Sequence, residues 1–145
     1  MPEPLPLPTA CVFDLDGTLV DSLQDIADAL NYCLELLGLP AQTPATYRYL
    51  VGEGVPVLCQ RVLGASHPHL VPRLAELVRP VYRTGMVVHT KPYAGVIELV
   101  ARLHARGVRL GVLSNKPHDM TVRVVQAFWP DDVFAAVYGY VEERY

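Results

Sequence analysis

The sequence predicts an α/β protein in which an all-helical segment is inserted after the first strand of a parallel sheet. Residues 9–13 form a short apolar run that ends at an aspartate and a glycine, as a buried strand followed by a loop does. Residues from about 22 to 85 show helical periodicity without a strand pattern. Residues 96–138 then alternate helix, strand, helix and strand, which favours a parallel sheet with crossover helices.

The inserted segment carries its own start and stop signals. Ser22 and Asp25 are predicted to form a capping box at the first helix, which Gly38 and Pro40 end. Further helical patterns are expected near residues 43–50, 57–63 and 70–82. We therefore expect a helical cap over residues 21–87 and a core made of residues 1–20 and 88–145.

The second part of the core supplies most of the expected sheet. A helix over residues 96–106 precedes a buried strand over residues 108–113. A helix over residues 120–128 and a last strand over residues 133–138 follow. The sequence thus predicts three strands for the core.

Composition excludes several classes of protein. The chain has 145 residues, 51% of them hydrophobic and 19% charged, which suits one folded domain and not a disordered chain. Its net charge of −3 does not indicate the basic surface that binds nucleic acid. No apolar run is long enough to span a membrane. The amino terminus has no basic start and no long apolar run, so no signal peptide is expected. Cys11, Cys33 and Cys59 lie in apolar patterns, as reduced core cysteines do, so a cytoplasmic protein is expected.

The segment Asp14-Leu-Asp-Gly-Thr18 is the strongest candidate site. It follows the first strand, and ligands of parallel sheets bind beyond the carboxyl ends of the strands. Asp14 can act as a nucleophile on phosphorus, and Asp16 can protonate the leaving oxygen and then activate water. Gly17 allows a close backbone approach, so that amides around Gly17 and Thr18 can hold phosphate oxygens. Mg²⁺ suits such a set of hard oxygens. The alternative is that both aspartates only make a turn and cap the next helix.

Residues 12–22, Val-Phe-Asp-Leu-Asp-Gly-Thr-Leu-Val-Asp-Ser, resemble the first motif of the haloacid-dehalogenase superfamily in its phosphoglycolate phosphatase-like branch. The similarity continues through residues 26–30, 51–54, 92–96 and 113–117. The resemblance implies a Rossmann-like core with an inserted helical cap. It also implies hydrolysis of a small phosphate monoester, such as phosphoglycolate, through a phosphoaspartate intermediate on Asp14. Mg²⁺ would be bound by the Asp14 side chain and the Asp16 backbone carbonyl, with Asp16 as general acid and base.

Ser114 and Asn115 follow the second expected strand, just before a helix opened by Pro117. Hydroxyl and amide groups at such a helix start can bind phosphate, although the same residues can serve as an ordinary helix cap. The resemblance assigns Ser114 to phosphate binding, and Asn115 is expected to position the pocket. Lys116 is expected to lie in a layer outside the residues that contact the ligand.

Two later motifs of the family, a lysine and an acidic pair that completes the metal site, have no match in this sequence. Glu142 and Glu143 follow the wrong strand to serve as the pair. We therefore expect an incomplete sheet and a chain that is inactive alone. A phosphosugar mutase of the same fold and a non-catalytic remnant are the alternatives. The particular phosphate ester and the oligomeric state are left open.

Overall fold

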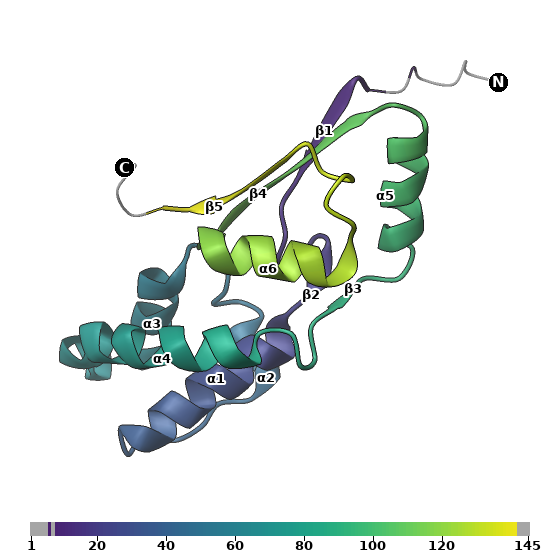
Figure 1. Ribbon diagram of the computed structural model, residues 1–145. Helices are drawn as coiled ribbons and strands as arrows, with labels where there is room; N and C mark the ends of the chain where they lie inside the picture. The colour runs from purple at the N-terminus through teal and green to yellow at the C-terminus, as the bar shows by residue number, and fades with distance from the viewer. Residues whose placement is uncertain (1–5, 7, 142–145) are drawn as a thin grey trace.

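The computed structural model, which describes residue 6 and residues 8–141, contains a parallel three-stranded sheet (Figure 1). The spatial order of its strands is β1 (Ala10–Phe13), β4 (Arg109–Pro117) and β5 (Ala136–Tyr140). Both pairs of neighbours are parallel, so the expected α/β fold is confirmed. Glu142 and Glu143 lie outside the described residues.

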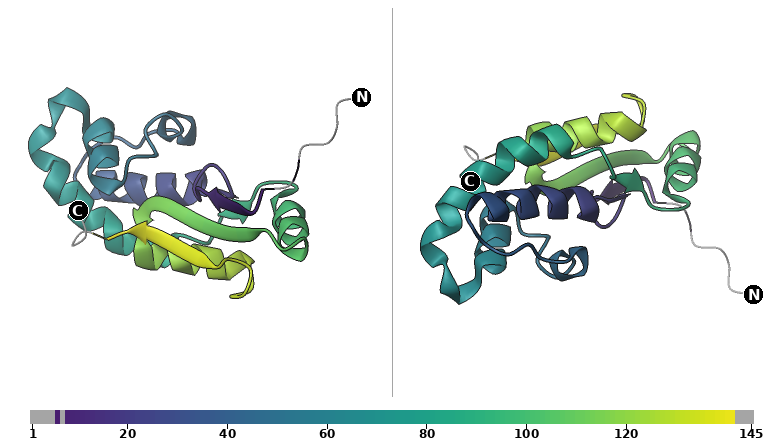
Figure 2. Two further views of the ribbon diagram at one scale, coloured as in Figure 1. Left: turned by 90° about the horizontal axis from the view of Figure 1, so that it is seen from above. Right: turned by 90° about the horizontal axis from the view of Figure 1, so that it is seen from below.

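One face of this sheet is covered by helix α6 (His118–Phe128), which connects β4 to β5 (Figure 2). Alternate residues of a strand point to opposite faces, so Val112 and its register partner Val137 share one side. Val112 is buried there, as are Met120 and Val124 of α6. Helix α5 (Val96–Ala105) precedes β4 and buries Val100.

The opposite face of the sheet has little cover from the described residues. Val12 is 70% exposed and Leu113 is 57% exposed, and the side chains of Tyr138 and Tyr140 are also exposed. We call these four residues the open face. They carry the apolar character of a buried strand surface, because each lies on the side of the strands that faces away from α6.

Only helices and turns occur between residues 22 and 87. They are α1 (Leu23–Leu36), α2 (Pro44–Tyr47), α3 (Val55–Leu63) and α4 (Val71–Gly85), with two short 3₁₀ turns between the last two. Leu30, Tyr47, Cys59 and Leu74 are all fully buried, so these helices pack around an apolar centre of their own. Figure 1 shows them together on one side of the sheet.

The helical segment leaves and rejoins the rest of the chain at neighbouring points. Strand β2 (Val20–Asp21) pairs antiparallel with β3 (Lys91–Pro92). Just beyond this pair, the buried Asp25 carboxylate accepts hydrogen bonds from three backbone N–H groups, those of Val88 at 3.1 Å, His89 at 2.8 Å and Thr90 at 2.8 Å. The Thr90 hydroxyl adds a bond of 2.6 Å. We call this arrangement the Asp25 clasp.

The expected capping box is therefore wrong. Ser22 precedes α1 but makes no side-chain capping bond, and its hydroxyl donates to Asp16 instead. The Asp25 carboxylate accepts hydrogen bonds from residues more than 60 positions later in the chain. The two residues have the right types for a local cap, but tertiary partners take both side chains.

Two element boundaries also differ from expectation. Strand β4 continues through Ser114 and Lys116 to Pro117, because Pro117 pairs with Tyr140 of β5. Strand β5 begins only at Ala136, after a turn that holds Trp129 and Phe134 in an edge-to-face contact. No helix within the described residues is long and apolar enough to cross a bilayer.

Candidate active site

A cavity of about 80 Å³ lies between the helices of residues 23–85 and the carboxyl ends of β1 and β4. Its polar lining comes from both sides, with Asp14 and Asp16 after β1, residues 114–116 of β4, and Arg79 and Tyr82 of α4. Apolar side chains of α1, α3, α4 and α6 complete it; they are Ile26, Ala29, Leu30, Val55, Leu58, Val78 and Met120.

Asp14 lies where the sequence places it, directly after β1. Phe13 is the register partner of Val112. Asp14 therefore follows β1 next to the part of the parallel strand β4 that contains Ser114, and both residues line the same cavity. The Asp14 side chain is exposed, and its Oδ1 accepts the Leu15 N–H at 2.7 Å. This carboxylate is therefore held at the base of the cavity with access to solvent and ligand.

The loop after Asp14 is a tight turn around one carbonyl group. The Leu15 carbonyl accepts N–H groups from Thr18 at 3.2 Å, Leu19 at 2.9 Å and Val20 at 3.1 Å. Gly17 has a φ of +81°, which a glycine adopts without strain, and its N–H donates to the Val20 carbonyl. Gly17 and Thr18 are exposed and do not line the cavity. Their amides are already used in the turn, and their role in phosphate binding stays a prediction.

Ser114, Asn115 and Lys116 are arranged by the pleat of β4. Ser114 and Lys116 are both buried on the same side of the strand, and the Ser114 Oγ accepts the Lys116 N–H at 3.2 Å. Asn115 is exposed on the other side, where its Nδ2 donates to the Gly52 carbonyl at 2.9 Å. Asn115 thus ties β4 to the loop before α3, and Ser114 presents its hydroxyl to the cavity.

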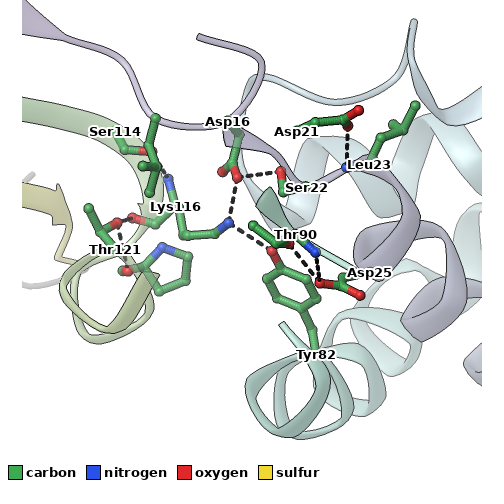
Figure 3. A network of polar contacts seen from close by, with 12 residues as sticks. Asp16, Asp21, Ser22, Leu23, Asp25, Tyr82, Thr90, Ser114, Lys116 and Thr121 are labelled. Atoms are coloured by element: carbon green, nitrogen blue, oxygen red, sulfur yellow. Dashed lines mark hydrogen bonds and ion pairs between the residues drawn. The ribbon is translucent and has the colours of Figure 1, made fainter. Parts of the chain in front are cut away.

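Lys116 connects the two sides of the cavity (Figure 3). Its Nζ donates to Asp16 Oδ1 at 2.6 Å and to the Tyr82 hydroxyl at 2.7 Å. Ser22 Oγ donates to the same Asp16 oxygen at 2.5 Å. Burial raises the pKa of Tyr82 well above its usual value, and the carboxylates of Asp16 and Asp25 raise it further, so the phenol stays neutral.

Sequence reasoning did not find Tyr82, and it placed Lys116 in an outer layer. Lys116 is one of only two lysines in the chain and lies two positions after Ser114. Had the strand been extended to Pro117, its alternation would have placed both on one face. Tyr82 gave no signal, because its spacing is that of any buried aromatic residue on a helix.

The acidic residues that line the cavity within the described part of the chain are Asp14 and Asp16. Mg²⁺ is commonly bound by one or two carboxylates together with phosphate oxygens and water, so this donor set fits that ion. A different group, Asp25, Asp28 and His89, brings ligand atoms within 4.8 Å of one another and could also hold a cation. It does not line the cavity, and Asp25 in it already accepts the hydrogen bonds of the clasp.

Comparison with known proteins agrees with this arrangement. Residues 11–144 match the family model of the haloacid dehalogenase-like hydrolases. A phosphoglycolate phosphatase from Mesorhizobium japonicum is 35% identical over 132 residues, which are 88% of this chain and 58% of that protein. One from Aquifex aeolicus is 34% identical over 128 residues, covering 88% of this chain and 59% of that protein.

Solved structures share the fold. A crystal structure from Lactobacillus delbrueckii subsp. bulgaricus superposes with a TM-score of 0.84 at 29% identity, covering 92% of this chain and 65% of that one. The crystal structure of a predicted phosphoglycolate phosphatase from Haemophilus somnus superposes with a TM-score of 0.83 at 28% identity. The match covers 90% of this chain and 62% of that one.

The chain spans about three fifths of the length of the curated relatives that it matches. The match nevertheless extends over most of the described residues, including both strands that carry the cavity's polar groups. On this ground the chain belongs to the family of haloacid dehalogenase-like hydrolases.

Proposed function

We propose that this site belongs to a Mg²⁺-dependent phosphatase that hydrolyses a small phosphate monoester, with phosphoglycolate as the model substrate. The observation that carries the proposal is the position of Asp14 and Ser114. Asp14 follows β1, Ser114 lies in the hydrogen-bonded parallel neighbour β4, and both line one cavity together with Asp16. The curated relatives named above are phosphoglycolate phosphatases, which supports the same reaction class.

In the first step, an Asp14 carboxylate oxygen attacks phosphorus and forms a P–O bond while the ester P–O bond breaks. Asp16 gives its proton to the departing alcohol oxygen. In the second step, Asp16 takes a proton from a water molecule that attacks the same phosphorus, and the bond to Asp14 breaks to release phosphate. Asp14 is exposed to the cavity, as a nucleophile must be.

The remaining residues hold the phosphate and limit repulsion. Ser114 and Asn115, which both line the cavity, would contact phosphate oxygens. Gly17 and Thr18 would contribute to phosphate binding only after the turn that uses their amides rearranges. The Asp14 side chain and the Asp16 backbone carbonyl would hold Mg²⁺, which supplies positive charge between a carboxylate and an anionic ester. Ser22 and Lys116 both donate to Oδ1 of Asp16, so Oδ2 is the oxygen that would transfer the proton.

Residues 21–87 would serve as a cap over the cavity. Side chains of α1, α3 and α4 form much of its wall, and these helices lie between residues 22 and 87, where no strand occurs. Movement of this segment would admit the ester and then exclude bulk water during attack.

The proposal is tested by phosphatase assays on two polypeptides, because the curated relatives are longer than this chain. One is the 145-residue chain, and the other is this chain joined to the carboxyl-terminal part of the Mesorhizobium relative. We expect Mg²⁺-dependent hydrolysis of phosphoglycolate by the joined protein and very little by the short chain, whose cavity offers two acidic residues.

Asp14→Asn should lower kcat of the joined protein by at least about 10³-fold, because it removes the nucleophile. Asp21→Asn is the matched control, since Asp21 lies in the following strand β2 and does not line the cavity. Full activity of Asp14→Asn, or equal losses in both variants, would show that Asp14 is not the nucleophile.

A further inference from the structure

We propose that Tyr82 is a positioning residue for this site. Its hydroxyl group holds Lys116, and Lys116 holds Asp16. Asp16 Oδ1 therefore accepts one hydrogen bond from Ser22 and a second one that depends on the position of α4. The role of Asp16 in catalysis rests on the proposed function, whereas the physical link from Tyr82 to Asp16 does not.

The link joins three separate parts of the chain (Figure 3). Tyr82 is on α4, Lys116 is on β4, and Asp16 is in the loop after β1. The Lys116 Nζ lies 2.7 Å from the Tyr82 hydroxyl and 2.6 Å from Asp16 Oδ1. It also lies 4.9 Å from the centre of the Tyr82 ring, within the range of a cation–π contact. Asp16 and Lys116 are 100 positions apart in sequence, so only the tertiary fold brings them together.

Burial makes this link more than a surface contact. The Lys116 side chain is only 3% exposed and Tyr82 is 8% exposed. A buried ammonium group is costly unless it is paired and hydrogen-bonded, and Asp16 and Tyr82 both accept hydrogen bonds from the Lys116 ammonium group. Without the Tyr82 hydroxyl, Lys116 would have to seek another acceptor or move toward water, and its bond to Asp16 would loosen.

The same end of α4 makes two further contacts with α6. Arg83, the next residue after Tyr82, pairs with Asp119 at 2.9 Å, and its carbonyl accepts a bond from Arg123 at 3.1 Å. These side chains are about half exposed, so the ion pair is weak and can break and reform readily. The position of α4 can therefore vary at its surface contacts, and the buried hydroxyl of Tyr82 transmits that position to Lys116.

The first test uses NMR on the 145-residue chain, without any assay of activity. We would follow the ¹⁵Nζ signal of Lys116 and the carboxyl ¹³C signal of Asp16 in Tyr82→Phe, which keeps the ring and removes the hydroxyl. We expect both signals to shift. Exchange of the Lys116 ammonium hydrogens should become faster on the order of tenfold, because one bond to a charged group is lost.

Tyr47→Phe is the matched control. Tyr47 is also buried on a helix of residues 23–85, and its hydroxyl donates to Asn31 at 2.6 Å without touching Lys116. It should leave both signals in place. Arg83→Ala should shift them in the same direction as Tyr82→Phe but by less. Unchanged signals in Tyr82→Phe, or equal changes in Tyr47→Phe, would overturn the proposal.

The second test measures kcat and KM of the joined protein. Tyr82→Phe should lower kcat and leave KM nearly unchanged, because the phosphate contacts remain while Asp16 is less well placed. A rise in KM with unchanged kcat would overturn the positioning role. If the unmodified joined protein has no phosphatase activity, the proposed function fails, and the NMR result still decides whether Tyr82 positions Asp16.

Discussion

The helices of residues 23–85 and the sheet bury their apolar residues in different ways. Leu74 of α4 is fully buried among the helices, and so are Leu30 and Cys59. In the sheet, α6 covers one side, whereas Val12 and Leu113 on the open face remain more than half exposed. Equal hydrophobicity in the sequence therefore does not mean equal contribution to stability, because that contribution depends on the area removed from water.

The largest expected effect tests this difference directly. Leu74→Ala should lower the free energy of unfolding by about 2–5 kcal/mol, because it removes a fully buried side chain and leaves a cavity. Leu113→Ala, the matched change on the open face, should cost no more than about 0.5 kcal/mol. Urea unfolding followed by circular dichroism measures both. Similar losses in the two variants would mean that the open face is covered in solution.

A second prediction concerns the Asp25 clasp, which connects the two regions. Asp25→Asn should lower the free energy of unfolding by about 2–3 kcal/mol, because a buried carboxylate that accepts several hydrogen bonds becomes an amide whose NH₂ faces N–H donors. Asp28→Asn, on the exposed side of the same helix, is the control and should change it by less than about 0.5 kcal/mol. Faster amide exchange at residues 88–90 only in Asp25→Asn would locate the effect. Equal exchange in both variants would argue against the clasp.

A third prediction, with the smallest effect for a change of one pH unit, is an alkaline loss of stability from the helical region. Burial raises the pKa of Cys59 from 9.0 to about 12. Between these two pH values the unfolded thiol has lost its proton while the folded one keeps it, so the unfolded chain binds fewer protons and stability falls as pH rises. One such group contributes about 1.4 kcal/mol per pH unit.

Unfolding curves between pH 9 and 11 measure that slope. Cys59→Ala should make it shallower, whatever the variant does to stability at neutral pH. Tyr47, whose pKa burial also raises to about 12, contributes a slope of the same sign above its ordinary value of 10.0. An unchanged slope in Cys59→Ala would show that Cys59 ionises alike in both states.

The parts of the fold that could be predicted are those with local signals. Periodicity located most helices and strands, and motif order placed Asp14 and Ser114 on neighbouring strands, which the register confirms. The extension of β4 to Pro117 could not be seen, because Ser-Asn-Lys-Pro has the composition of a loop and its pairing with Tyr140 is a tertiary event. The hydrogen-bond partners of Asp25 and Tyr82 were missed for the same reason, since they lie 34 or more residues away.

The pairing of β2 with β3 has a consequence for how this protein can change over evolution. The chain leaves the core at Val20 and returns at Pro92, its register partner. The helices between these two residues are therefore inserted into the chain at one place, the β2–β3 pair. Recombination at the β2–β3 pair can lengthen, shorten or exchange the intervening helices while β1 and β4 keep their register. The part of the cavity wall that these helices form can thus be inherited separately from Asp14, after β1, and Ser114, in β4.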